Sequence, residues 1–246
     1  MNDTLGTISA ASQRATVMAL IASVDPEEVS RAMASSPAWP ADASPRVVEG
    51  PYYLTDQALV RRDITEGRQG IPLLLRIAVH GVASSGPVAG AKVDVWHCDA
   101  GGHYSGHLDE DPDRPHENTS LASRPATDEQ RFLRGVQITD SMGVAEFATI
   151  YPGWYYSRSI HVHVKIHVGD QEVYVGQLYL PEQYNRIVEN LPPYNAHGTS
   201  LERLPNADDF VYESMGGSSL LIDVRPLSEE GPAAGYTGSI LLSIPA

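Results

Sequence analysis

Two histidines two positions apart, His161 and His163, are the first candidates for chemistry in this sequence. On an extended strand, side chains alternate between the two faces, so both imidazoles leave the same face. Tyr155 comes six residues before His161, after a turn-forming Pro-Gly pair, and Arg158 lies between them. Two imidazoles and a phenol together favour an oxidised, hard metal over zinc.

The elements that must position these residues are mostly strands. Apolar runs that alternate with polar residues predict strands over 72–82, 91–97, 134–139, 144–150 and 172–179, and in the tail at 210–213, 220–224 and 239–244. A short helix is expected to begin near Pro181. Many short strands with Gly and Pro turns indicate a mainly β fold, with a β-sandwich core of mixed short strands. In the acidic stretch 108–131 the apolar residues recur at no regular spacing, which predicts a surface loop at the rim of a cleft.

The N-terminal part has a different pattern. Helical apolar spacings over 12–35 predict two short helices, and three prolines within 36–46 predict an extended linker. We therefore expect residues 1–45 to form a small helical appendage with its linker, and residues 46–246 to form one catalytic domain. The apolar helices suggest a homodimer contact, and the alternative is a cap on the domain's own core.

Composition excludes several partners. The chain has 17 Lys and Arg against 31 Asp and Glu, a net charge of -14, which disfavours nucleic acid and anionic membranes. No apolar stretch approaches the roughly 20 residues needed to span a bilayer. With Cys98 as the one cysteine and no secretory pattern at the N-terminus, the expected location is the cytoplasm.

Further motifs, taken together in order and spacing, resemble the intradiol ring-cleavage dioxygenases, the family of catechol and protocatechuate dioxygenases. The resemblance covers roughly residues 46–245, and its pieces are the segments 49–53, 90–100, 101–105, 132–135, 139–143, 149–155 and 158–163. Each piece alone is a weak signal, but their combination is specific.

This resemblance implies a metal centre and a reaction. Matched residue by residue, the ligands of a non-haem Fe(3+) are Tyr104, Tyr155, His161 and His163. Phenolate is a hard anionic donor, and a bound trivalent ion can displace a phenol proton whose ordinary pKa is about 10. The implied partners are a small aromatic diol and O2. The implied reaction cleaves the catechol-type ring between its two hydroxyl-bearing carbons to a cis,cis-muconate-type diacid.

The same resemblance assigns roles around the metal. Arg158 matches the cation that stabilises the activated substrate, Gln177 matches the pocket glutamine that orients it, and Tyr155 accepts a substrate proton. Besides Arg158 and Gln177, the expected substrate contacts are Tyr52, Trp154 and Tyr156.

Two departures from the better-known members leave the identity of the diol open. Only five residues separate Tyr155 from His161, so one wall of the pocket is expected to be shorter and the pocket more open. The acidic loop 108–131, in contrast, is long. Catechol, hydroxyquinol and other substituted diols all stay candidates.

Other interpretations of the same residues stand beside this one. A transthyretin-like β-sandwich could bind a ligand without chemistry, and a zinc hydrolase could use His161, His163 and a carboxylate such as Asp99. Three more histidines surround Tyr104, namely His97, His103 and His107. Neither His97 nor His103 has a second candidate ligand at a spacing typical of metal sites, so we expect them not to be metal ligands.

Overall fold

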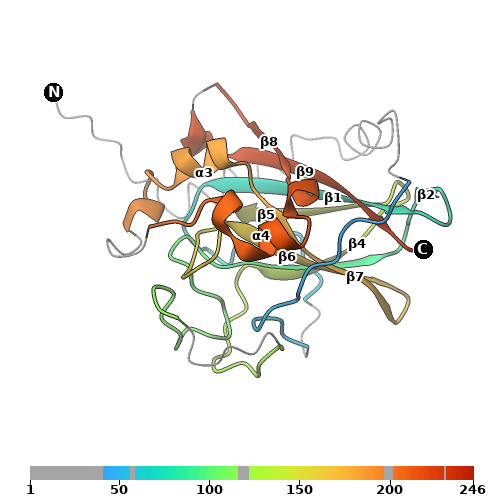
Figure 1. Ribbon diagram of the computed structural model, residues 1–246, viewed down its shortest axis with the longest axis horizontal. Helices are drawn as coiled ribbons and strands as arrows, with labels where there is room; N and C mark the ends of the chain where they lie inside the picture. The colour runs from blue at the N-terminus through green and yellow to red at the C-terminus, as the bar shows by residue number, and fades with distance from the viewer. Residues whose placement is uncertain (1–40, 56–58, 116–121, 197–201, 230) are drawn as a thin grey trace.

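The computed structural model describes residues 41–55, 59–115, 122–196, 202–229 and 231–246, and in these ranges the chain is mainly β. Its strands form two sheets, and its helices are short (Figure 1). The helices expected over 12–35 lie outside the described residues. The N-terminal appendage, the homodimer contact and the domain boundary at residue 46 therefore stay predictions.

The first sheet is built around its longest strand, β1 (Pro72–Gly81). This strand pairs antiparallel with β5 (Val144–Ile150) and parallel with β9 (Tyr236–Ile244). The short β2 (Gly86–Pro87) pairs with the end of β1, and β8 (Asp223–Pro226) pairs with β9. The C-terminal strand thus lies beside the first long strand of the fold.

The second sheet carries the histidine pair. Its order is β4 (Arg134–Ile138), β3 (Lys92–Trp96), β6 (His161–Val168) and β7 (Gln171–Tyr179), with every neighbouring pair antiparallel. Strand β6 is hydrogen-bonded on both sides, which fixes its register. In Figure 1 the turn from β6 to β7 is at the right, and the green segment that follows β3 is at the left.

The two sheets share one core. A single buried cluster contains Leu75 and Ile77 of β1, Val93 of β3, and Val162 and Val164 of β6. The β-branched residues of β3 and β6 fit a pleated, buried surface, as expected from the alternating pattern. The predicted mainly β, two-sheet architecture is confirmed.

The helices follow the second sheet. They are α3 (Glu182–Val188) and α4 (Phe210–Ser214), with 3-10 turns η1 (Tyr194–Ala196), η2 (Asn206–Asp208), η3 (Gly217–Leu220) and η4 (Pro232–Ala234). The strand predicted over 210–213 is wrong, because this segment is helix α4. The cause is Asp209, whose side chain accepts hydrogen bonds from the backbone N–H groups of Val211 and Tyr212 and so caps a helical turn.

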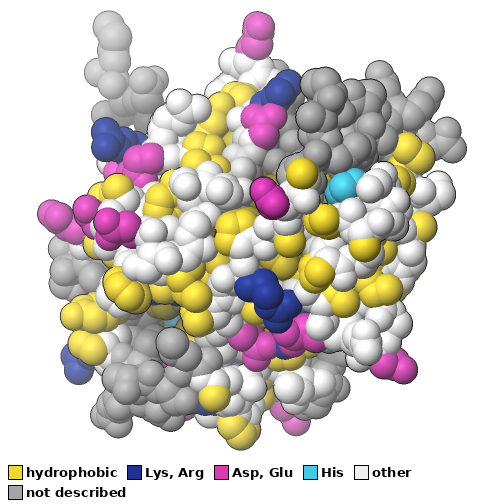
Figure 2. Space-filling model, turned by 45° about the vertical axis from the view of Figure 1, so that its right-hand side comes forward, with side chains coloured by type: hydrophobic (Ala, Val, Ile, Leu, Met, Phe, Trp, Pro, Cys, Tyr) yellow, Lys and Arg dark blue, Asp and Glu magenta, His cyan; other side chains and the backbone are white. Residues whose placement is uncertain are grey.

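The surface agrees with the acidic composition. On the face drawn in Figure 2, acidic side chains are scattered beside fewer basic ones. Among the helices of the described ranges, none is long and apolar enough to cross a membrane.

Candidate metal centre

The histidine pair lies at the start of β6. His161 and His163 are buried, with 2 % and 1 % of their surface exposed, and their Nε2 atoms face each other at 3.1 Å. The intervening Val162 points to the other face and packs in the shared core. Strand periodicity therefore places both imidazoles as predicted.

Two phenols reach the same point from loops. The Tyr155 hydroxyl, from the segment before β6, lies 3.2 Å from His161 Nε2. The Tyr104 hydroxyl, from the segment after β3, lies 3.1 Å from His163 Nε2. Four buried donor atoms thus form one continuous chain of contacts, and we call Tyr104, Tyr155, His161 and His163 the donor cluster.

The two loops meet through close backbone packing. The Gly153 N–H donates to the Asp99 carbonyl oxygen at 3.1 Å, and a Cβ at Gly153 would lie only 2.4 Å from that oxygen. Glycine is therefore required at this contact, which brings the segment of Tyr155 against the segment of Tyr104.

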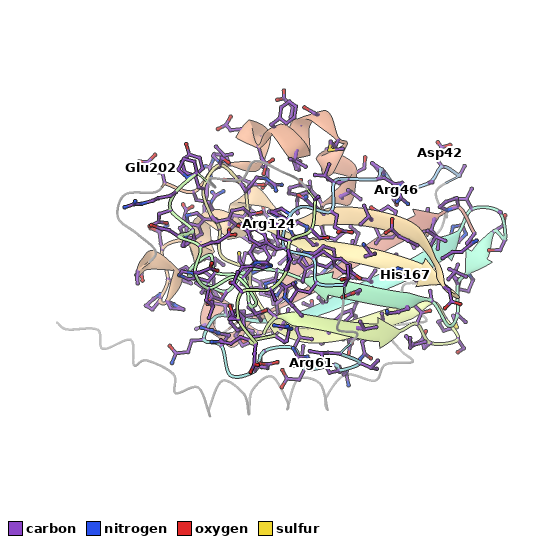
Figure 3. All side chains as sticks on the ribbon, turned by 90° about the horizontal axis from the view of Figure 1, so that it is seen from below. Asp42, Arg46, Arg61, Arg124, His167 and Glu202 are labelled. Carbon is purple, nitrogen blue, oxygen red and sulfur yellow. The ribbon has the colours of Figure 1, made fainter. Side chains whose placement is uncertain are left out.

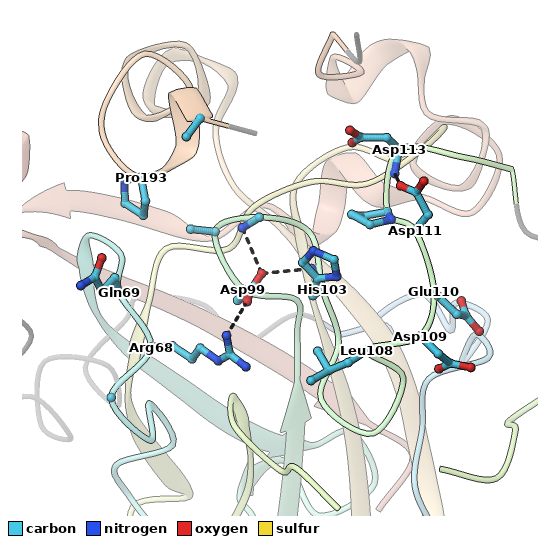
Figure 4. A pocket seen from close by; sticks show the side chains of 15 residues that line it. Arg68, Gln69, Asp99, His103, Leu108, Asp109, Glu110, Asp111, Asp113 and Pro193 are labelled. Atoms are coloured by element: carbon cyan, nitrogen blue, oxygen red, sulfur yellow. Dashed lines mark hydrogen bonds and ion pairs between the residues drawn. The ribbon is translucent and has the colours of Figure 1, made fainter. Parts of the chain in front are cut away.

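Asp99 shapes the turn that leads to Tyr104. Its Oδ1 accepts from the backbone N–H groups of Gly101 and His103, both at 3.0 Å, and its Oδ2 pairs with Arg68 at 3.3 Å (Figure 4). Among the described residues, no group of three or more His, Cys, Asp or Glu side chains could hold a metal ion. The zinc site built from His161, His163 and Asp99 is thus not favoured.

The donor cluster has the protonation pattern of a metal site. His161 Nδ1 is 2.7 Å from the Ser159 carbonyl, which can only accept, so the ring proton is on Nδ1 and the Nε2 lone pair faces the cluster. Burial and the nearby Arg158 cation lower the pKa of His161 to about 3. Burial, followed by the neighbouring His161, lowers the pKa of His163 well below its ordinary value. Both imidazoles are therefore neutral.

The phenols are protonated for a related reason. Burial raises the pKa of Tyr104 well above its ordinary value, and burial raises that of Tyr155 to about 12 although the Arg158 cation opposes the rise. A metal ion reverses this preference, because its charge stabilises phenolate. Four converging neutral donors, two of which can become anions, fit a trivalent ion.

Arg158 lies beside the donor cluster and is held from several sides. Its Nη1 is 3.4 Å from the Tyr155 hydroxyl, Nη2 donates to Gln177 Oε1, and Nε donates to Asp209 Oδ2 at 3.0 Å. Gln177 is itself fixed, since its amide donates to the Val48 carbonyl at 2.9 Å. Burial lowers the pKa of Arg158, but the Tyr155 oxygen in its phenolate form and the Asp209 carboxylate outweigh burial and raise it above its ordinary value.

This geometry agrees with the comparison to known sequences. A sequence model of the family described as Dioxygenase matches residues 48–189, more than half of the 246-residue chain. The chain belongs to the intradiol ring-cleavage dioxygenase family. The sequence is also 25 % identical over 202 residues to a catechol 1,2-dioxygenase of Pseudomonas sp. strain EST1001. That match covers 76 % of this chain and 65 % of the relative, so the chain spans less than two thirds of the relative's length.

Solved structures give the same result. An intradiol ring-cleavage dioxygenase from Tetranychus urticae is 30 % identical, with a TM-score of 0.73 over 83 % of this chain and 95 % of that chain. The dioxygenase domain of a carbohydrate-binding fusion protein from Streptomyces sp. SirexAA-E is 27 % identical, with a TM-score of 0.56 over 82 % and 97 % of the two chains.

The other predicted site residues of this chain differ in their burial and in what they contact. Tyr52 is buried and stacks on the Tyr104 ring, with centroids 4.1 Å apart and planes at 12°. Trp154 packs into the shared core, and Tyr156 is half-exposed beside Tyr155. Their roles as substrate contacts stay predictions.

His97 has a structural position between the two sheets. Its Nδ1 is 2.7 Å from the Cys98 carbonyl and its Nε2 is 2.7 Å from the Thr149 hydroxyl of β5. Both ring nitrogens are engaged, so His97 connects the two sheets.

Sequence reasoning missed Asp209. Its carboxylate is fully buried, and Oδ2 accepts from Arg158 and from the backbone and hydroxyl of Ser159. An Asp directly before an apolar pair is a helix N-cap signal, and that signal could have found it. Interpreting 210–213 as a strand hid the cap.

Proposed function

We propose that this protein is a non-haem Fe(3+) dioxygenase that cleaves a catechol-type ring between its two hydroxyl-bearing carbons. The observation that carries the proposal is the convergence of two phenols and two neutral imidazoles beside a partly buried arginine, Arg158. Membership of the intradiol family supports it, as does the name of the Pseudomonas relative, catechol 1,2-dioxygenase.

In this proposal the donor cluster, Tyr104, Tyr155, His161 and His163, holds the ion. Phenolate oxygens are hard anionic donors that favour the ferric state, and the Ser159 carbonyl keeps the His161 lone pair directed at the ion. When bound, Fe(3+) would supply Lewis acidity and would activate the diol toward O2.

The chain's own residues have defined tasks in the reaction. Once the ion has displaced its own proton, the Tyr155 phenolate oxygen would take one of the two protons that a catechol gives up on binding, and the other proton would leave to solvent. Arg158, 3.4 Å from that oxygen, stabilises the negative charge that develops on the substrate. Gln177 and Asp209 hold the guanidinium in place, so little reorganisation is needed during the reaction. Both atoms of O2 enter the product, a cis,cis-muconate-type diacid.

The test combines metal analysis, colour and oxygen uptake. Purified protein should contain iron and show the visible absorption of phenolate bound to Fe(3+). Oxygen uptake should then be measured with catechol, protocatechuate, hydroxyquinol and pyrogallol. Product spectra distinguish muconates from the yellow semialdehydes that cleavage outside the diol would give. Colourless, iron-free protein that consumes no O2 with any of the four would contradict the proposal.

Two outcomes would favour the rival functions. Stoichiometric zinc without iron would favour a hydrolase. Ligand binding that survives both Tyr155→Phe and His161→Ala, together with no oxygen uptake, would favour a binding module of transthyretin type. Neither rival explains why two phenols converge on the histidine pair.

A further inference from the structure

The start of the acidic loop contacts the supports of both phenol donors. We call residues 108–113 the acidic segment, because it carries Asp109, Glu110, Asp111 and Asp113. It lines a cavity of about 780 Å³, and Figure 4 shows the four carboxylates following one another along the chain. Neither the metal site nor the reaction proposed above uses this segment.

Glu110 makes the first contact, through Tyr52. The Tyr52 hydroxyl donates to Glu110 Oε2 at 2.8 Å, while Arg124 Nη1 pairs with Glu110 Oε1 at 2.6 Å. Figure 3 shows Arg124 among the loops at the end of the second sheet that carries the site. The Arg124 guanidinium also lies 5.5 Å from the centroid of the Tyr52 ring. The hydroxyl of Tyr52 and its ring are therefore both held.

Tyr52 in turn packs on a donor. Its ring lies parallel to the Tyr104 ring at 4.1 Å, and Tyr155 meets the Tyr104 ring edge-on at 5.6 Å. Tyr104 comes from a loop, so no strand ladder fixes its direction. Its orientation depends on the rings that pack against it. Tyr52 covers one face of Tyr104 and so restricts the tilt of its ring, while the contact with His163 restricts its hydroxyl.

The second contact reaches the other phenol. The Pro112 carbonyl accepts a hydrogen bond from the backbone N–H of Tyr156 at 2.7 Å, directly after Tyr155. The acidic segment is itself anchored, because Asp128 accepts from the N–H groups of Gly106 and Leu108 at 3.0 and 2.9 Å. The segment therefore joins the short turn before β6 to the loop that carries Tyr104.

We propose that Glu110 is a positioning residue that acts through Tyr52 to fix the Tyr104 phenol in the donor cluster. The inference rests on the proposed function, since the phenol must be fixed for a metal. Partners that orient metal ligands from outside the coordination shell typically change metal affinity or activity about 10- to 100-fold when they are removed. The Glu110–Tyr52 pair is such a partner for Tyr104.

The test is a double-mutant cycle between Glu110 and Tyr52. Glu110→Ala removes the acceptor, Tyr52→Phe removes the donor and keeps the ring, and the double variant removes both. Two quantities are measured on iron-loaded protein: the wavelength of the phenolate-to-iron absorption band, and the rate of iron loss to excess chelator. Each single variant should shift the band and lose iron about tenfold faster. The double variant should be no worse than either single one.

Two further variants separate positioning from charge and from folding. Glu110→Gln keeps an oxygen acceptor for Tyr52, so it should restore most of the band position and the iron retention. Asp111→Asn removes the same charge from the same segment at a half-exposed aspartate that pairs with Arg114, and it should behave like the wild type. Thermal melting of the metal-free proteins checks that the near-isosteric variants, Tyr52→Phe and Glu110→Gln, are folded.

The outcomes distinguish this inference from the proposed function. Suppose that the wild type is red and active, and that Tyr52→Phe and Glu110→Ala keep its absorption band and its rate of iron loss. This result would overturn the positioning role and leave the proposed function standing. Independent, additive effects of the two substitutions would also overturn it, because the role requires Glu110 to act through Tyr52. Iron-free wild type would overturn the proposed function and this role with it.

Discussion

The donor cluster has a strand-built half and a loop-built half. His161 and His163 lie on β6, which is hydrogen-bonded to β3 and β7 along both edges. Tyr104 and Tyr155 come from irregular segments, held by a glycine contact, an Asp turn and stacked rings. The strand half depends on local periodicity, whereas the loop half depends on many separate long-range contacts. The two halves should therefore respond differently to substitution.

The strand half should give the largest effect. In His163→Ala the donor cluster loses one imidazole whose direction the sheet fixes, so iron content should fall and activity should drop by more than about 100-fold, the upper end for partners outside the coordination shell. His167→Ala is the matched control at the far end of the same strand (Figure 3). Iron analysis and oxygen uptake measure both. Equal iron content in the two variants would contradict a role for His163 as ligand.

A substitution beside the loop half, at Arg158, should affect the reaction without affecting metal binding. Arg158→Lys keeps a cation but loses the planar fork that contacts Tyr155, Gln177 and Asp209 together. We expect kcat to fall about 100-fold with iron content and absorption band nearly unchanged. Arg225→Lys, at an exposed ion pair, is the control. Loss of iron in Arg158→Lys would mean that the arginine holds the site together rather than acting on the substrate.

The contact between the two loops can be broken at Gly153. Gly153→Ala places a Cβ 2.4 Å from the Asp99 carbonyl, so the backbone must shift, at a cost of about 1–3 kcal/mol in the free energy of unfolding. Iron retention should fall as well, because the shift separates Tyr104 from Tyr155. Urea unfolding and chelator challenge measure the two effects. Gly86→Ala, where the Cβ would lie 3.8 Å from the Ser84 carbonyl oxygen, should be close to neutral.

The sheet frame should be sensitive to acid through His97. Burial, opposed by the hydrogen bond that His97 donates to the Cys98 carbonyl and aided by the Arg134 cation, lowers the pKa of His97 to about 4. The unfolded chain, with a His pKa near 6.5, binds more protons between these values, so stability is lost as pH falls through this window. Between pH 7 and pH 5 this loss is about 1–2 kcal/mol.

The His97 contribution is measured as a difference. Urea unfolding of the metal-free protein at pH 7 and pH 5 should show a larger loss for the wild type than for His97→Gln. The histidines of the donor cluster are present in both proteins and cancel. The same pH dependence in both proteins would show that His97 does not titrate as its burial requires.

Several features were predictable because they depend on neighbours in the sequence. The period of two places His161 and His163 on one face, and the alternating runs predict β3, β4, β5 and β7 within a few residues. The resemblance, carried by the order of the motifs, predicts Tyr104 as a donor although 50 residues separate it from Tyr155. The strands and turns could be predicted because strand periodicity and turn chemistry depend only on residues that are close in the sequence.

Other features could not be predicted from the sequence, because they depend on contacts between distant residues or because the local apolar pattern favoured a different element. Asp209 lies 51 residues from Arg158 and caps α4, where the apolar residues favoured a strand. Glu110 gave no signal of its own among the acidic residues of its loop. Its contact with Tyr52 spans 58 residues and exists only once both loops are folded.

The sequence alone is enough to infer a mainly β fold, the histidine pair and the family, since each follows from spacing along the chain. Only the tertiary structure decides which side chains support the donors. Burial leaves the four donors neutral, the Asp209 carboxylate holds Arg158, and the acidic segment contacts the supports of both phenols. Burial and partner choice are set by packing between distant segments, and no local pattern specifies that packing.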